Sequence, residues 1–135
     1  MTRGTRPLTG WLTAIVLAHL AISFVHGSAH SSAGVLLSAS QSAFVYVVIL
    51  AAPLAGLVIL RFSRSAGLWI IALSLLASLI FGVVNHFVLE SADHVNRVGP
   101  PWQATFTITA WLLAVTEALG SGIALWAIRR TGRVS

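Results

Sequence analysis

The stretch Ala66–Leu89 reads AGLWIIALSLLASLIFGVVNHFVL and contains no Asp, Glu, Lys or Arg. A helix needs about 20 predominantly apolar residues to cross the hydrocarbon core of a bilayer, and this stretch is long enough. Three other stretches resemble it in length and composition: Leu8–His30, Ser42–Phe62 and Ala104–Ile128. The sequence therefore predicts four transmembrane helices.

The composition places almost the whole chain in a membrane. Of its 135 residues, 57% are hydrophobic and 8% are charged, and the mean hydropathy is +0.92. Soluble domains carry about 25% charged residues, so a soluble domain is excluded. Only short loops and tails lie outside the four spans, which indicates one transmembrane domain over residues 1–135. Short connections favour antiparallel neighbours, and we expect an all-α, up-down-up-down four-helix bundle.

The basic residues predict how this bundle is oriented. All eight are arginines, and most of them flank the start of the first span, the loop between the second and third spans, or the end of the fourth: Arg3, Arg6, Arg61, Arg64, Arg129, Arg130 and Arg133. Cytoplasmic segments are enriched in arginine, so both termini and the middle loop are predicted to be cytoplasmic. The same rule explains a pI near 11.8 without nucleic acid as a partner. We expect a multi-pass protein of the cell membrane, in contact with the lipid bilayer.

The first span also shares features with a signal peptide. A basic start, an apolar stretch and the small residues near Gly27–Ala29 are typical of such peptides. The apolar stretch is long for a signal peptide, however, and it contains His19. We therefore favour a retained transmembrane helix.

The second span contains no ionisable residue, but Pro53 lies near its middle. Proline has no N–H with which to bond the carbonyl four residues earlier, and this kinks a helix. Inside a membrane the freed carbonyl must find another partner. We predict a kink here, with the carbonyl satisfied by a neighbouring helix.

Ionisable side chains are few, and eight of them lie on or at the end of the apolar spans: His19, His26, His30, His86, Glu90, Asp93, His94 and Glu117. Such groups are costly at membrane depth and tend to mark functional sites. A helix advances 100° per residue, so the three histidines of the first span form one stripe. The group at the end of the third span shares a face, with His94 at its edge, if the helix continues that far. Both stripes are expected to face the bundle interior.

Depth along the spans pairs these residues across the bundle. At 1.5 Å per residue, the centre of the bilayer falls near both His19 and Glu117. His26 and His86 both lie about 10 Å above it, and His30 lies one turn further out. We predict a midplane polar pair of His19 and Glu117. It would act as a proton relay or ion path, or as a buried hydrogen bond between helices.

The residues placed above the midplane, towards the outer surface, predict a metal site. Imidazole and carboxylate together suit zinc, iron, manganese or copper(II), and helical bundles build such sites from facing helices. Adjacent turns carry two histidines on the first span, and a histidine and a glutamate on the third. The predicted metal ligands are therefore His26, His30, His86 and Glu90, and Asp93 and His94 would be peripheral ligands. The chain has no cysteine, so thiolate sites and disulfides are excluded.

Three functions remain open at this level. The first is a membrane protein whose outer-leaflet histidine and carboxylate site binds or handles a divalent transition metal. The second is a b-type haem protein, with His26 and His86 as axial ligands and a quinone nearby. The third is a non-catalytic accessory subunit of a larger membrane complex, or a homo-oligomer, whose polar groups only hydrogen-bond one another or a partner. The sequence indicates neither a reaction nor a substrate.

Overall fold

The computed structural model describes residues 6–131, and every regular element in that part of the chain is helical. The elements are α1 (Arg6–Ser32), α2 (Ala39–Phe44), the π-helix η1 (Val45–Ala51), α3 (Ala52–Ile59), α4 (Arg64–Val83), the π-helix η2 (Val84–Val88) and α5 (Gln103–Thr131). Arg3 and Arg133, on which part of the predicted orientation rests, lie outside the described residues.

Four helical stretches are long and apolar enough to cross a membrane: Pro7–Ser32, Ala39–Ile59, Arg64–Val88 and Gln103–Arg130. The second stretch combines α2, η1 and α3, and the third combines α4 and η2. The prediction of an all-helical chain with four potential spans is therefore confirmed. The second stretch begins earlier than predicted because Ser38 caps it. The Ser38 hydroxyl accepts from the Gln41 N–H, and the Gln41 side chain accepts from the Ser38 N–H.

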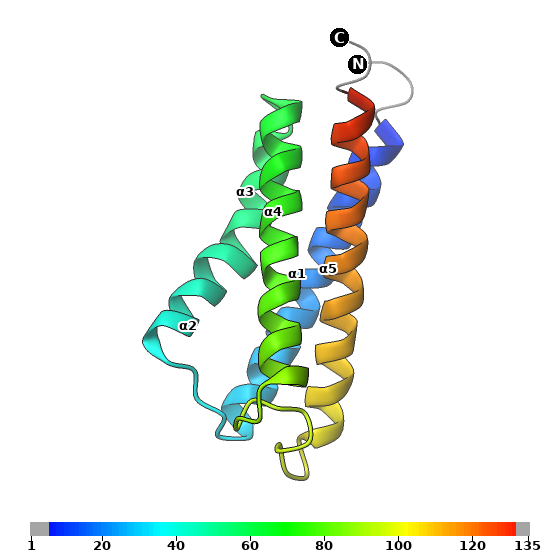
Figure 1. Cartoon of the computed structure of the whole chain (residues 1–135). Coiled ribbons are helices and arrows are strands. Elements are labelled where there is room, and N and C mark those ends of the chain that lie inside the picture. The colour runs from blue at the N-terminus through cyan, green and yellow to red at the C-terminus, as the bar shows by residue number, and fades with distance from the viewer. Residues whose placement is uncertain (1–5, 132–135) are drawn as a thin grey trace.

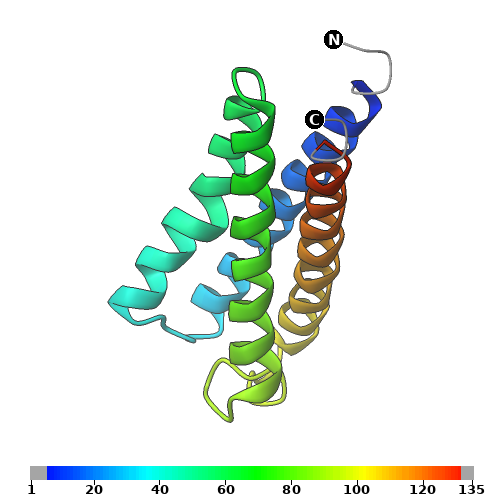
Figure 2. The ribbon, with the colours of Figure 1, turned by 45° about the horizontal axis from the view of Figure 1, so that its top comes forward.

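The four spans lie side by side and alternate in direction, so α1 begins and α5 ends at the same end of the molecule as the α3–α4 turn (Figure 1). α5 packs against both α1 and α4, and α4 packs against α3. Gly56 permits the close approach of α3 to α4, because a Cβ there would lie 2.6 Å from Ile71 Cγ1. By contrast, α2 and η1 lean away from α1, so the first and second spans diverge towards their connection (Figures 1 and 2).

The buried apolar residues form two clusters along the bundle. One lies towards the α3–α4 turn and consists of Leu12, Val16, Leu68, Ile71, Ala72, Leu75, Ala124 and Ala127. The other lies at the opposite end and consists of Ala29, Val35, Val95, Val98, Phe106 and Ala110. Many large apolar side chains are exposed, among them Trp11, Phe24 and Trp111. Such wide apolar exposure suits contact with lipid.

Candidate metal centre

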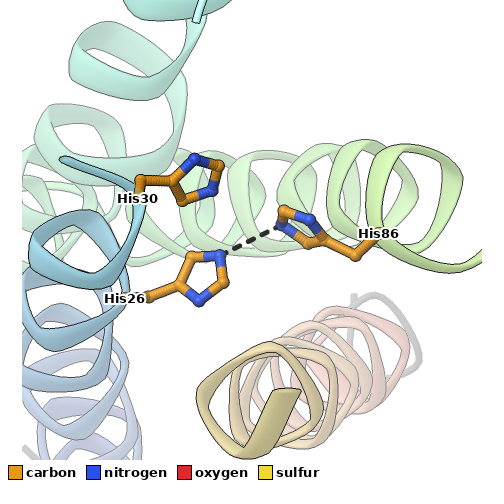
Figure 3. A group of neighbouring side chains, drawn as sticks. All are labelled: His26, His30 and His86. Carbon is orange, nitrogen blue, oxygen red and sulfur yellow. Dashed lines mark hydrogen bonds between the residues drawn. The ribbon is translucent and has the colours of Figure 1, made fainter. Parts of the chain in front are cut away.

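Three buried histidines meet between α1 and η2. His26 and His30 lie on adjacent turns at the end of α1, and His86 faces them from η2 (Figure 3). Each residue is at most 8% exposed, and one ring nitrogen from each lies within 4.8 Å of the others. Three potential ligand atoms at such separations could hold a metal ion.

The geometry of η2 places His86 in this histidine group. Hydrogen bonds in a π-helix join residues five apart, and such segments are frequent at functional sites. The Leu89 N–H donates to the Val84 carbonyl, and Leu89 is extended, with φ −80° and ψ 125°, so the helix ends there. The chain then folds back, and the Val95 N–H donates to the His86 carbonyl at 3.0 Å.

The Nδ1 atoms of all three rings are held by partners outside the histidine group. These partners are Thr109 Oγ1 for His26 (2.8 Å), the Val35 carbonyl for His30 (3.3 Å) and the Asp93 carbonyl for His86 (3.0 Å). Hydrogen bonds of this kind fix the orientation of metal-binding histidines and leave the other ring nitrogen for the metal. The Nε2 atoms of His26 and His86 face each other, and that of His30 lies beside the Asp93 carboxylate.

The partner of His86 decides which of its ring nitrogens carries the proton. The Asp93 carbonyl beside His86 Nδ1 can only accept, so that nitrogen carries the proton and His86 Nε2 presents a lone pair. His26 Nδ1 lies 2.8 Å from Thr109 Oγ1, whose hydroxyl donates to the Thr105 carbonyl at 2.7 Å. His26 Nε2 faces His86 Nε2 across 3.2 Å. A proton or a cation is needed between them, and two ligands of a tetrahedral zinc ion lie about 3.3 Å apart.

Asp93 supplies a carboxylate beside the three rings. Its Oδ1 lies 3.2 Å from His30 Nε2 and 3.2 Å from His86 Nδ1. The side chain is buried, and neither carboxylate oxygen has a hydrogen-bond partner of adequate geometry among the described residues. A buried carboxylate in this state is costly alone, whereas a bound cation beside it would offset that cost.

Two residues expected at the site lie outside the histidine group. Because the helix ends before it reaches Glu90, that side chain does not follow His86 one turn later. The exposed Glu90 carboxylate accepts a 2.9 Å hydrogen bond from Arg97, and this bond, with the guanidinium charge, holds the pKa of Glu90 below its ordinary value. His94 is buried, and its Nδ1 accepts from the Asn96 N–H at 3.2 Å.

α5 contributes two residues that were not among the predicted ligands. The Phe106 ring packs against all three imidazoles, with centroid separations of 4.6, 4.7 and 5.3 Å. Thr109 holds His26 from the same side. A stripe of Thr105, Thr109 and Thr116 is visible in the sequence, but nothing in it indicates which threonine meets a histidine.

A second polar contact lies nearer the middle of the spans. His19 and Glu117 are fully buried or nearly so, and His19 Nδ1 lies 3.6 Å from Glu117 Oε1. This separation is too long for a hydrogen bond. His19 Nε2 donates to the Ile49 carbonyl at 3.1 Å, which is the carbonyl that Pro53 leaves without an N–H donor four residues later. Nδ1 therefore carries a lone pair and directs it toward Glu117.

One cavity joins these two contacts. It has a volume of about 710 Å³ and lies between α1, the α2–η1 segment, the α4–η2 segment and α5. Its wall includes the three histidines, Asp93 and Glu117. Gly82 lies between the two contacts, because a Cβ there would be 3.9 Å from His86 Cδ2 and 4.0 Å from Glu117 Oε2. A small molecule in the cavity could therefore reach both.

The arrangement favours a single ion over a bis-histidine haem. Axial ligands lie on opposite faces of a porphyrin, which must pass between them. Only 3.2 Å separates the facing nitrogens of His26 and His86. The adjoining space is filled by His30 and Phe106, whose ring centroids lie 4.8 and 4.6 Å from that of His26.

Comparison with models of protein families, with curated proteins and with solved structures finds no match to this chain. The function is therefore inferred from the geometry of the site.

Proposed function

We propose that this chain is a multi-pass protein of the cell membrane that binds one divalent transition metal ion through His26, His30 and His86. The observation that carries the proposal is the 3.2 Å separation of the Nε2 atoms of His26 and His86, which face each other in a buried position. A third imidazole and the carboxylate of Asp93 lie beside them. The Nδ1 hydrogen bonds already orient the rings, so binding requires little rearrangement.

The ligand types limit which ions the site would take. Imidazole with a nearby carboxylate suits zinc, iron, manganese or copper(II), and the chain has no thiolate for softer ions. Three histidine ligands leave a fourth position on a tetrahedral ion, as in catalytic zinc sites. The cavity borders all three histidines, so water or a substrate could occupy that position.

We place this site in the outer half of the membrane. Arg61 and Arg64 lie at the α3–α4 turn, and Arg129 and Arg130 lie at the end of α5 on the same end of the molecule, whereas the histidine group lies towards the opposite end (Figure 1). By the positive-inside rule the arginine-rich end is cytoplasmic. A C-terminal fusion to a reporter that works only in the cytoplasm should be active. Activity of a reporter that works only outside the cytoplasm would contradict this orientation.

Cobalt titration of the purified, metal-free protein in detergent tests the metal site. We expect one Co²⁺ per chain, with the visible absorption of a nitrogen-ligated tetrahedral ion. His86→Ala removes one of three ligands and should weaken binding by at least about tenfold. His94→Ala is the matched control, because His94 is equally buried and close in sequence but lies outside the group, and it should bind cobalt as the unaltered protein does.

Two results would contradict the proposal. One is the absence of stoichiometric cobalt binding to the unaltered protein, which would favour an accessory subunit whose histidines only hydrogen-bond one another. The other is an equal loss of binding in His86→Ala and His94→Ala, which would show that the histidine group is not the site. A Soret band in the purified protein would select haem instead.

A further inference from the structure

We propose that the cavity beside the histidine group binds a membrane-soluble molecule with a hydroxyl group on a long apolar chain. This molecule would reach the cavity sideways from the bilayer, between α1 and η1. The proposal goes beyond metal binding and does not depend on it. It rests on the cavity and on Glu117, which is not among the proposed metal ligands.

Part of the cavity wall lies at membrane depth. The wall includes Phe24 of α1 and Tyr46 of η1, which are 70% and 67% exposed, and η1 diverges from α1 (Figure 1). Phe24 lies about 7 Å along its helix from the middle of the first span, and Tyr46 lies about 4.5 Å from the middle of the second. The hydrocarbon core extends about 15 Å on either side of its centre. These exposed side chains of the cavity wall therefore lie at the depth of the lipid tails.

The walls further in are mostly apolar, and both π-helices contribute to them. Apolar lining residues include Ile49, Leu50, Phe81 and Leu113. The volume of about 710 Å³ falls within the range of roughly 300–1,000 Å³ found for small-molecule pockets. An apolar chain would lie against these side chains, and its head group would meet the polar groups beyond them.

At the inner end of the cavity, the carboxyl group of Glu117 is a hydrogen-bond acceptor to which none of the described residues is seen to donate. Glu117 is 3% exposed, its Oε1 is turned toward His19, and its Oε2 is turned toward the space beside Gly82. His19 Nδ1 stays beyond hydrogen-bonding distance, and it presents a lone pair. In either protonation state a carboxyl group keeps an oxygen that can accept a hydrogen bond. A ligand hydroxyl can donate to that oxygen.

Photolabelling of the metal-free protein in lipid nanodiscs tests this proposal. The probe is hexadecanol with a diazirine in the middle of its chain, and labelled residues are mapped by mass spectrometry. We expect labels on half-buried cavity residues such as Ile49, Phe81 and Leu113. Unlabelled hexadecanol should compete for these positions at least about tenfold better than hexadecane, because only the alcohol can donate a hydrogen bond to a buried acceptor.

Two glycine variants provide the matched comparison. Gly82→Leu places a side chain between His86 and Glu117, inside the cavity, and should reduce labelling of the cavity residues severalfold. Gly122→Leu makes the same change on α5 where no other group lies within 4 Å of the added Cβ, and its labelling should match that of the unaltered protein. Helix content and chromatographic behaviour of both variants show whether they are folded.

Three outcomes would overturn the proposal. Labels spread evenly over lipid-facing positions would indicate only the surrounding bilayer lipid. Equal competition by hexadecane would exclude recognition of the hydroxyl. Equal labelling of a folded Gly82→Leu variant would exclude the cavity, and if that variant does not fold, the competition experiment on the unaltered protein decides alone. Because no metal is present, none of these outcomes bears on cobalt binding.

Discussion

Thr109→Val removes the oxygen that accepts from His26 Nδ1–H while keeping the shape of the side chain. The hydrogen bond is 2.8 Å long and buried, and the threonine proton is already donated to the Thr105 carbonyl. In the variant the imidazole N–H is left without this partner, which lowers the free energy of unfolding by about 1–3 kcal/mol. The ring is then free to turn, so Nε2 is no longer held toward His86. Removing the hydrogen-bond partner that orients a metal ligand lowers metal affinity by about 10–100-fold.

Thr116→Val is the matched control on the same helix, because the Thr116 hydroxyl donates to the carbonyls of Leu112 and Leu113 and to no histidine. Competition of each variant with a chelator of known zinc affinity measures the effect. We expect a dissociation constant about 10–100-fold higher for Thr109→Val and unchanged for Thr116→Val. Equal zinc affinities in the two variants would refute the role given to Thr109.

Three further predictions concern groups outside the histidine group. Glu117→Leu should lower the thermal unfolding midpoint in detergent more than Glu117→Gln, because glutamine keeps a polar group beside His19; equal midpoints would argue against this contact. His19→Leu should destabilise a Pro53→Ala background less than the unaltered protein, because alanine restores an N–H for the freed carbonyl, and additive effects in a double-mutant cycle would contradict this. The hydrogen bond and charge of Arg97 hold the pKa of Glu90 below 4.5, so the stabilisation from this ion pair is present above that pH and is lost as the pH falls through the lowered pKa. Arg97→Gln should raise the pKa of the Glu90 carboxyl group, measured by NMR titration, and leave zinc affinity unchanged.

The four spans could be predicted because a bilayer demands long apolar helices, and this demand is visible in composition alone. Depth arithmetic placed His26 level with His86, and His19 level with Glu117. The facing atoms of these pairs lie 3.2 and 3.6 Å apart in the structure. Distance along a straight helix is therefore a usable guide to which residues on neighbouring spans meet.

The end of the third span shows where that reasoning stops. Helical spacing brings Glu90 over His86, but the π-helix η2 changes the turn and the chain then leaves the helix at Leu89. Asp93, four residues beyond that point, returns to the site through a loop instead. No periodicity encodes such a reversal, because it depends on loop contacts such as the bond from Val95 N–H to the His86 carbonyl.

X-ray absorption spectroscopy of the zinc-loaded protein tests the central claim most directly. The account predicts one zinc ion per chain, with three imidazole nitrogens at about 2.0–2.1 Å, contributed by His26, His30 and His86. His86→Ala should lower the number of imidazole scatterers, and His94→Ala should leave it unchanged. A zinc shell of oxygen atoms alone, or an imidazole count that His86→Ala does not alter, would contradict the account.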